Sequence, residues 1–501
     1  MGRTVVGDES QLEAQVDSIF RSGAPVQVGI LVGKLGTGSS RDLVFALVPT
    51  PPKDGEEAAT LGPSDPQGSR DTGARKGNKG KPASDGVPVQ IATDWVAEHA
   101  RQVSRMLLGG LHVVGIYLFS SEGSFRSSLA VLWKAVTAVA AVILSGNDGV
   151  DSSEYLLLHI SSSPRRLSCR SCPGNAPYSA TILRPCEWKT GKLLDNLQEF
   201  ACTYSVDIRY PVIVDQPDRK LESLRKYLYS SVAAEAKRLE TAQAIVDGKL
   251  VKPDDMLGSG NVVHAVEFIQ PIDGGAATGS IRHGRKMKGR VFFKGDLHAR
   301  AYAVVREPLS RAVADLKGDI VSSLRSRLEL LVDEAEEAEE DARAQDKDAD
   351  VPNVPPPETL LSTQLSMDVK EHSVAMPRRV LVPWLEGTMI CDYMLPDESL
   401  EDVQERCMDL LGLEQSVDIS SFIEVEILGL VPEVVQPAPA ASPAPQTSRS
   451  TNTNLDRSID QNVVLKDKKT SSFSFPLAFV GAVLTVMLGL LLSRFLMQKQ
   501  Q

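Results

Sequence analysis

Residues 94–119 read DWVAEHARQVSRMLLGGLHVVGIYLF, and this stretch decides the fold of the first half of the chain. Its first part carries apolar residues at helical spacing behind Asp94, which can cap a helix, and it stops at Gly109-Gly110. Residues 111–119 then form an almost continuous apolar run. We therefore predict a helix that ends at the glycine pair and leads directly into a buried strand.

The segments around this stretch alternate between helix and strand. Residues 26–32 and 43–48 are apolar and β-branched, and the turn-forming residues between them predict a hairpin. Further elements are predicted at 9–21 (helix), 126–144 (helix) and 155–161 (strand). This order predicts a mixed α/β (α+β) fold around a mostly buried sheet.

The second half of the chain continues the mixture of helix and strand. Strands are predicted at 204–214, 262–269, 289–305 and 380–385, and helices at 219–247 and 310–338. The second of these helices begins with an apolar stripe and passes into an acidic run. Such a stripe predicts packing against a sheet, with a partner helix as the alternative.

Composition divides the chain into folded and unfolded segments, because stretches of Gly, Pro, Ser and charged residues cannot bury enough apolar surface to fold. The predicted organisation begins with an N-terminal α/β domain at 1–214, which contains a disordered insertion at 51–88. A second α/β region follows at 215–433, with an acidic disordered segment at 334–358. A disordered tether at 434–472 then leads to a transmembrane helix at 473–492.

Residues 473–492 contain no charged side chain and would span about 30 Å as a helix, enough to cross a hydrocarbon core. Lysine and arginine flank the run, as at membrane interfaces. We predict a single C-terminal membrane anchor, with a buried core helix as the alternative. Its candidate anchor residues are Phe473, Pro476, Gly481, Gly489 and Leu492. The N-terminus lacks the features of a signal peptide, which predicts a tail-anchored protein with a cytosolic body.

Charge and cysteine content exclude two classes of protein. The net charge is −11, with no segment that builds the basic surface needed to neutralise phosphates, so nucleic acid is not an expected partner. Six irregularly spaced cysteines in 501 residues do not form a disulfide framework.

The cysteines offer one possible metal site. Cys169 and Cys172 have the spacing of a zinc knuckle, and Cys186 and Cys202 follow at a distance. The second pair is not a tight knuckle, so ordinary buried or surface thiols remain the alternative. We predict no cofactor, no metal ligand and no catalytic residue.

Residues 113–117, which follow the glycine pair, resemble the core strand of MPN-type metalloprotease domains. The positions that would hold the zinc ligands of those enzymes are Leu118, Ser120 and Val131 here, and none of them fits that ligand set. The resemblance implies an MPN-like N-terminal domain without a metal site, a pseudo-enzyme that works by pairing with a domain of the same shape.

A stronger resemblance covers nearly the whole chain. Its motifs follow one another in the order expected of a known family. They are Met1-Gly2-Arg3-Thr4, Pro49-Thr50-Pro51-Pro52, Trp95, the block from Glu98 to Leu111, Leu158-His159-Ile160, Cys391-Asp392-Tyr393 and Asp397-Glu398-Ser399. These motifs resemble the odorant-response abnormal protein four (Odr-4-like) family. The long insertion before Asp94 and the extended acidic and Pro-Ala linkers depart from the family's pattern.

The resemblance implies a non-enzymatic adaptor of the endoplasmic-reticulum membrane that assists the folding, trafficking or localisation of polytopic membrane proteins, such as G-protein-coupled odorant receptors. It also implies a partner, the protease specific for ubiquitin-fold modifier. The alternatives are a membrane-tethered hydrolase that uses Cys391 or Cys407 as its nucleophile, and a structural scaffold on a passive anchor.

The family block supplies the candidate partner-binding residues, which are Trp95, Glu98, His99, Gln102, Ser104, Arg105, Gly109 and Gly110. Within the predicted helix, Trp95 and Met106 should face the core, as should Val103 and Leu107. Glu98, Gln102 and Arg105 lie on adjoining turns and could form polar contacts. A helix that only packs on a sheet is the alternative.

Overall fold

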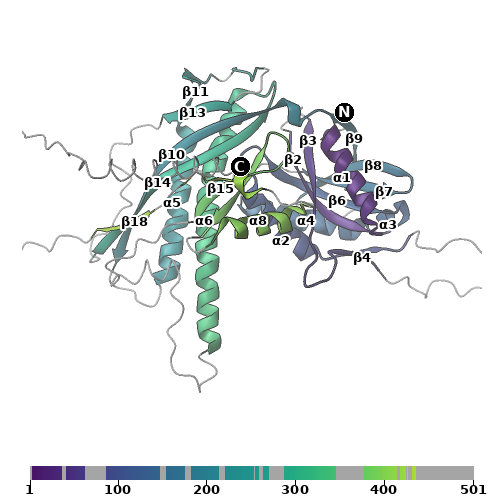
Figure 1. Ribbon diagram of the computed structural model, residues 1–501, viewed down its shortest axis with the longest axis horizontal. Helices are drawn as coiled ribbons and strands as arrows, with labels where there is room; N and C mark the ends of the chain where they lie inside the picture. The colour runs from purple at the N-terminus through teal and green to yellow at the C-terminus, as the bar shows by residue number, and fades with distance from the viewer. Residues whose placement is uncertain are drawn as a thin grey trace, which may run out of the picture. The chain divides into compact units, whose positions relative to one another are not determined.

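The computed structural model (Figure 1) places most of the chain up to residue 435. The described residues are 3–36, 41–62, 86–146, 154–174, 182–213, 220–252, 254–258, 263–269, 287–345, 377–395, 398–413, 418–424, 426 and 431–435. All of them belong to one compact unit, Met1–Ala438.

Seven strands in the first half of this unit form a closed barrel. In spatial order they are β1 (Thr4–Asp8), β3 (Asp42–Pro49), β2 (Gln27–Lys34), β6 (His112–Ser120), β7 (Glu154–Ser162), β8 (Arg165–Pro173) and β9 (Arg184–Gly191). The barrel closes because β1 pairs in parallel with both β3 and β9. Strands β6 and β7 are also parallel, whereas the other neighbours are antiparallel.

Strands β2, β6 and β7 are buried on both faces, because their successive side chains belong to different apolar clusters. Leu31 packs on the face that α1 (Glu9–Ser22) covers, whereas Ile30 and Val32 point to the opposite face. That second face is covered by α2 (Thr93–Met106) and α4 (Leu129–Gly146). The short helix α3 (Glu122–Ser127) and the pair β4 (Ala59–Leu61) and β5 (Val89–Ile91) complete this part.

A second, six-stranded sheet follows in the sequence. Its strands in spatial order are β12 (Lys249–Leu250), β11 (Gln243–Val246), β13 (Val263–Ile269), β10 (Leu197–Ile213), β14 (Met287–Val304) and β18 (Val431–Val435). The apolar stripe of α6 (Leu309–Gln345) packs on this sheet beside α5 (Lys220–Thr241), with Leu316, Ile320 and Leu324 all buried. The stripe therefore meets a sheet, as the sequence predicts, and also a second helix.

The described part of residues 378–424 packs between the barrel and the second sheet. Strands β15 (Arg378–Pro383), β16 (Met389–Met394) and β17 (Ile423–Glu424) form a small antiparallel sheet, and α8 (Leu400–Leu411) follows β16. Val380, Ile390 and Val403 belong to the same apolar cluster as the face of the barrel sheet that α2 and α4 cover. This part of the chain therefore folds back onto the N-terminal half.

The predicted fold class is wrong in its first part, because the N-terminal strands form a closed seven-stranded barrel, where we predicted a mixed α/β layer around a mostly buried sheet. The barrel closes through β8 and β9, which the sequence analysis did not predict. Strand β9 reads RPCEWKTG and is mostly exposed, so it lacks the apolar pattern that marks a buried strand. The structure is mixed α+β with a closed barrel.

A second correction to the predicted fold class concerns the transmembrane helix. Among the described residues, no helix is both long and apolar enough to cross a membrane. The predicted single-pass location in the endoplasmic-reticulum membrane has no support among these residues. The segment 473–492, with Phe473, Pro476, Gly481, Gly489 and Leu492, lies outside the described residues. The strongly apolar helix α4 packs in the core of the compact unit, with Leu132, Val136 and Val139 fully buried.

Helix boundaries differ from the prediction in two places. Helix α5 ends at Thr241 because residues 243–246 form strand β11. Helix α6 continues to Gln345, into the segment 334–358 for which we predicted disorder. The domain boundaries stay a prediction.

Substituting alanine for glycine should have opposite effects on stability at a tightly packed position of the barrel and at an exposed position of α6. A Cβ on Gly115 in β6 would lie 1.9 Å from the backbone oxygen of Leu156, whereas a Cβ on the exposed helical Gly318 would meet nothing within 4 Å. We expect Gly115→Ala to reduce the free energy of unfolding by roughly 1–3 kcal/mol or more through overpacking. Gly318→Ala should increase it by about 0.5–1 kcal/mol. Urea denaturation of the full chain measures both, and equal effects would contradict this packing.

Candidate functional site

Helix α2 carries most of the candidate partner-binding residues and touches all major parts of the compact unit. It contacts α4, β2 and β6 of the first half, and α6, α8 and β16 of the second. Its apolar face is buried, with Val96, Ala100 and Val103 fully covered and Met106 nearly so. Trp95 packs against this core and donates from Nε1 to the carbonyl of Pro51 at 2.8 Å.

His99 lies inside this junction and is fully buried. Its Nε2 lies 2.7 Å from the carbonyl oxygen of Leu410 in α8, and its Nδ1 lies 3.2 Å from the hydroxyl of Thr50 at the end of β3. Burial lowers the pKa of His99, against a smaller raising effect of the Leu410 carbonyl. A neutral ring satisfies both contacts when Nε2 donates to Leu410 and Nδ1 accepts from Thr50.

Arg105 connects the end of α2 to α6. Its guanidinium donates to Glu329 at 2.7 and 2.9 Å and to Asp333 at 3.4 Å. Its backbone oxygen lies 3.6 Å from the sulfur of Cys391 in β16. Arg105 therefore joins α2 to α6 and β16, two elements that lie more than two hundred residues later in the sequence.

The glycine pair after α2 lets the chain touch strand β14. The backbone of Gly109 bonds to Arg300 and Tyr302 at 3.0 and 2.8 Å. A Cβ on Gly109 would lie 2.5 Å from the oxygen of Asp315, and Gly110 has a φ of +82° that only glycine adopts readily. Glycine is therefore needed at these two positions for two reasons. The backbone passes close to β14 and to Asp315 here, and the helix ends here.

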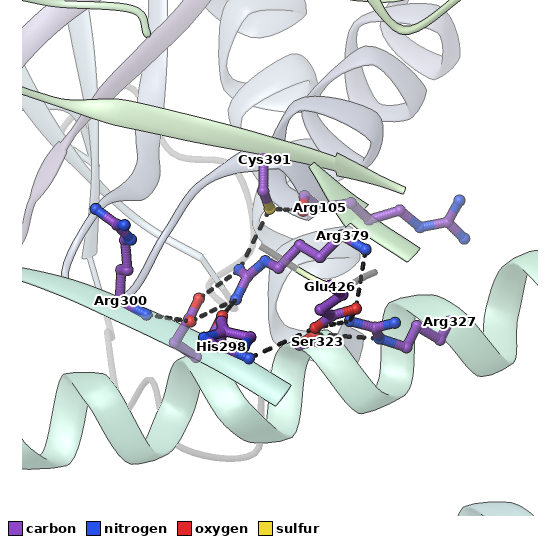
Figure 2. A network of polar contacts seen from close by, with 9 residues as sticks. Arg105, His298, Arg300, Ser323, Arg327, Arg379, Cys391 and Glu426 are labelled. Atoms are coloured by element: carbon purple, nitrogen blue, oxygen red, sulfur yellow. Dashed lines mark hydrogen bonds and ion pairs between the residues drawn. The ribbon is translucent and has the colours of Figure 1, made fainter. Parts of the chain in front are cut away.

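The most polar part of the junction is buried beneath the β15–β16 hairpin. Figure 2 shows Arg379 of β15 within this group of side chains, close to Cys391 and Glu426. Two nitrogens of Arg379 donate to the carboxylate of Asp319 in α6 at 2.7 and 2.8 Å. Both side chains are almost fully buried. Asp319 also accepts from the backbone N–H of Arg300 at 2.9 Å, and Arg379 donates to the carbonyl of His298 at 3.1 Å.

A second buried ion pair lies beside the first. Arg327, two turns along α6 from Asp319, contacts both carboxylate oxygens of Glu426 at 2.7 Å. It also donates to the carbonyl of Pro377, and Glu426 accepts from the backbone N–H of Arg379 at 3.1 Å. Both arginines lie against the ring of Tyr393, at 5.3 and 5.9 Å from its centre. We refer to Asp319, Arg327, Arg379 and Glu426 as the buried charge network.

A smaller group of candidate residues reaches the surface. Glu98 is 36 % exposed and accepts from Arg101 and from the amide of Gln102, at 2.7 and 2.9 Å. Arg101 lowers the pKa of Glu98 through this hydrogen bond, against desolvation. Ser104 is half-buried on the same helix. The outer surface of α2 is therefore polar and carries both signs of charge.

Neither cysteine of the hydrolase alternative is placed as a nucleophile. Cys391 is fully buried, and burial raises the pKa of its thiol although Arg379 lies 3.3 Å from its sulfur. Burial also raises the pKa of Cys407, which is fully buried in α8. A reactive thiol needs exposure and a lowered pKa, so this geometry argues against the hydrolase.

The four cysteines of the possible zinc site are not brought together. Cys169 and Cys172 lie three residues apart on strand β8, so their side chains point to opposite faces and belong to different apolar clusters. Cys202 lies in the other sheet. Among the residues that the structure describes, no three His, Cys, Asp or Glu side chains are grouped to hold a metal ion.

The sequence analysis missed the buried charge network, although a weak signal for it was present. Asp319, Ser323 and Arg327 recur at four-residue spacing beside the apolar stripe of α6, where a soluble helix usually begins its exposed face. Arg379 directly precedes the apolar run of β15. Nothing in the sequence pairs these residues with each other, and Glu426 lies in a segment without periodicity.

Comparisons with known proteins agree on one family. The family model described as Odorant response abnormal 4-like matches residues 29–422. The Protein odr-4 homolog of Mus musculus is 25% identical over 482 residues, which cover 92% of this chain and 95% of that protein. The homolog of Homo sapiens is 26% identical over 435 residues, 82% of this chain and 83% of its own. The Odorant response abnormal protein 4 of Caenorhabditis elegans is 21% identical over 347 residues, 66% and 65% of the two chains.

UfSP from C. elegans is among the solved structures that align with this chain. It has 8% identity over 82% of this chain and 57% of that chain, and a TM-score of 0.38. A TM-score this low does not indicate a common fold.

The buried charge network predicts unequal effects for two adjacent arginines. Arg379→Met leaves the carboxylate of Asp319 buried without its ion-pair partner, which should cost roughly 3–5 kcal/mol in the free energy of unfolding. Arg378→Met removes a partly exposed pair with Glu424 and should cost about 0–1 kcal/mol. Chemical denaturation of both variants tests this, and a small loss for Arg379→Met would show that the network is not essential.

The buried histidines predict that acid destabilises the fold. Burial lowers the pKa of His99 and of His159 below 6.5, so the folded state stays neutral where the unfolded state takes up protons. Stability should therefore be full above about pH 6.5 and fall as the pH decreases, by up to about 1.4 kcal/mol per pH unit for each histidine. His99→Gln should flatten this pH dependence, because glutamine does not titrate. Its amide keeps a donor for the Leu410 carbonyl, so the contact with α8 is preserved. Melting temperatures between pH 7.5 and 5.5 test it, and parallel curves would exclude His99 as a source.

Proposed function

Because this chain belongs to the Odorant response abnormal 4-like family, we propose that it is a non-enzymatic adaptor that assists the folding, trafficking or localisation of polytopic membrane proteins. The observation that carries the proposal is the family match over residues 29–422, which includes six of the seven barrel strands in whole or in part, the second sheet except β18, and the β15–β16 hairpin. The relative in C. elegans is named for an abnormal odorant response, so receptors of the odorant class are the first clients to test.

The geometry supports an adaptor rather than a hydrolase. The residues of the family block hold α2, α6, α8 and β14 together through His99, Arg105 and Gly109. Cys391 and Cys407 are enclosed in the same body. The arrangement thus supplies a rigid surface assembled from distant segments, which is what recognition of another protein requires.

We place the partner surface on the polar side of α2 and the adjoining turn of α6. Glu98 and Arg101 are each 36 % exposed, and Glu329 and Asp333 of α6 lie next to them, 31 % and 49 % exposed. Charges of both signs at this level of exposure give specificity and orientation to an encounter more than they give affinity. The protease specific for ubiquitin-fold modifier is the partner that the family resemblance implies, and we propose that this surface binds it.

The test is affinity purification of the tagged full chain followed by mass spectrometry. Glu98→Lys places a positive charge beside Arg101 and should reduce recovery of the protease severalfold, because like charges replace an ion pair at the surface. Asp17→Lys is the matched control, since Asp17 pairs with Arg165 on another part of the surface and is 48 % exposed. It should leave recovery unchanged.

Three outcomes separate the parts of this proposal. Recovery of the protease and of membrane-spanning clients with the unaltered chain supports the adaptor function. Equal recovery with Glu98→Lys keeps the function and excludes the α2 surface. If the unaltered chain recovers neither class of protein, the adaptor function itself is wrong.

A further inference from the structure

Two of the six cysteines face each other across the strands that close the barrel. Cys169 in β8 is the register partner of Cys186 in β9, and the two strands are antiparallel. Directly opposed residues of such a pair have Cα atoms about 4.5–5.5 Å apart, within the range that a disulfide bond spans. The described structure holds both as free thiols.

The two thiols lie in different surroundings although they are neighbours. Cys169 is only 3 % exposed and packs in the apolar cluster on the α1 face. Cys186 is partly exposed at the edge of the same cluster. One sulfur is thus accessible from solvent, and the other lies immediately behind it.

The local charges favour a thiolate at the exposed position. A hydrogen bond from Cys169 lowers the pKa of Cys186 to about 7, with further lowering from Ser171 and from the guanidinium of Arg3, against burial and the carboxylate of Asp42. The same hydrogen bond raises the pKa of Cys169, which therefore keeps its proton. The lowered pKa of Cys186 favours the nucleophilic thiolate form at this position.

The other four cysteines provide an internal comparison. Cys172, Cys202, Cys391 and Cys407 are all buried. Burial raises the pKa of Cys172 to about 11 and that of Cys202 to about 12. They should be inert under conditions in which Cys186 reacts.

We propose that Cys186 and Cys169 form a peroxide-reactive pair, which a hydroperoxide converts into a disulfide bond between β8 and β9. The Cys186 thiolate attacks the O–O bond, which gives a sulfenic acid and releases the alcohol or water of the peroxide. The Cys169 thiol then attacks that sulfur, forms the S–S bond and releases water. In total, two thiols are oxidised and one hydroperoxide is reduced.

The bond would form at the position where the barrel closes. Strand β9 pairs with β8 on one side and with β1 on the other, and the N–H of Glu187 donates to the carbonyl of Arg3 at 2.9 Å. Oxidation would therefore fasten the closing strand to its neighbour covalently. This inference does not depend on the proposed adaptor function.

The test uses the reduced full chain with hydrogen peroxide, followed by mass spectrometry of a non-reducing digest. The expected product is a peptide that links Cys169 to Cys186. Cys169→Ser should leave a sulfenic acid on Cys186 that dimedone traps, and Cys186→Ser should abolish both products. Cys172→Ser is the matched control on the opposite face of β8 and should still form the disulfide.

A second measurement needs no variant. In the unaltered folded chain, iodoacetamide at pH 7.5 should alkylate Cys186 at least tenfold faster than any of the other five cysteines. Oxidation of Cys186 no faster than Cys172, or a disulfide between any other two positions, would overturn the proposal.

Discussion

The arrangement of the second half of the chain depends on two arginines that are buried and paired. A guanidinium cannot lose its proton in a protein, so Arg327 and Arg379 must meet carboxylates wherever they are covered. They meet Glu426 and Asp319, and those carboxylates also accept backbone N–H groups from β14 and β15. The hairpin, α6 and β14 therefore have one satisfactory alignment. Shifting any of them would leave a charge buried without a partner.

This constraint extends to the family block on α2. The backbone oxygen of Arg105 lies beside Cys391, whose sulfur contacts Arg379, and its side chain pairs with α6 beyond the network. His99 and Gly109 add contacts to α8 and β14. Several residues of the family block, namely His99, Arg105 and Gly109, thus join the two halves of the chain. The candidate partner-binding set accordingly divides into an inner group that holds the fold and an outer group, Glu98 and Gln102, that faces solvent.

The elements with strong periodicity were predictable from the sequence, and their arrangement was not. The apolar run at 111–119 and the stripe that begins at Val313 indicated β6 and α6, because burial of one or both faces leaves a regular pattern. Strands β8 and β9 lack that pattern, so the closure of the barrel was missed. The buried charge network joins α6, β15 and residue 426, and pairing across such distances is a property of the fold alone. For the same reason the Cys-x-x-Cys spacing suggested a metal knuckle, whereas the extended backbone of β8 separates the two sulfurs.

The closure of the barrel also sets a condition on how the chain folds during synthesis. Strand β1 pairs with β9, and the contact between Thr4 and Glu187 spans 183 residues. A ribosome adding about 5–20 residues per second needs roughly 10–40 seconds to make that length. Throughout this time one edge of β1 has no strand beside it, and an open edge is a template for pairing with other chains. The edge of β1 in a nascent chain therefore stays open to pairing with other chains until β9 has been made.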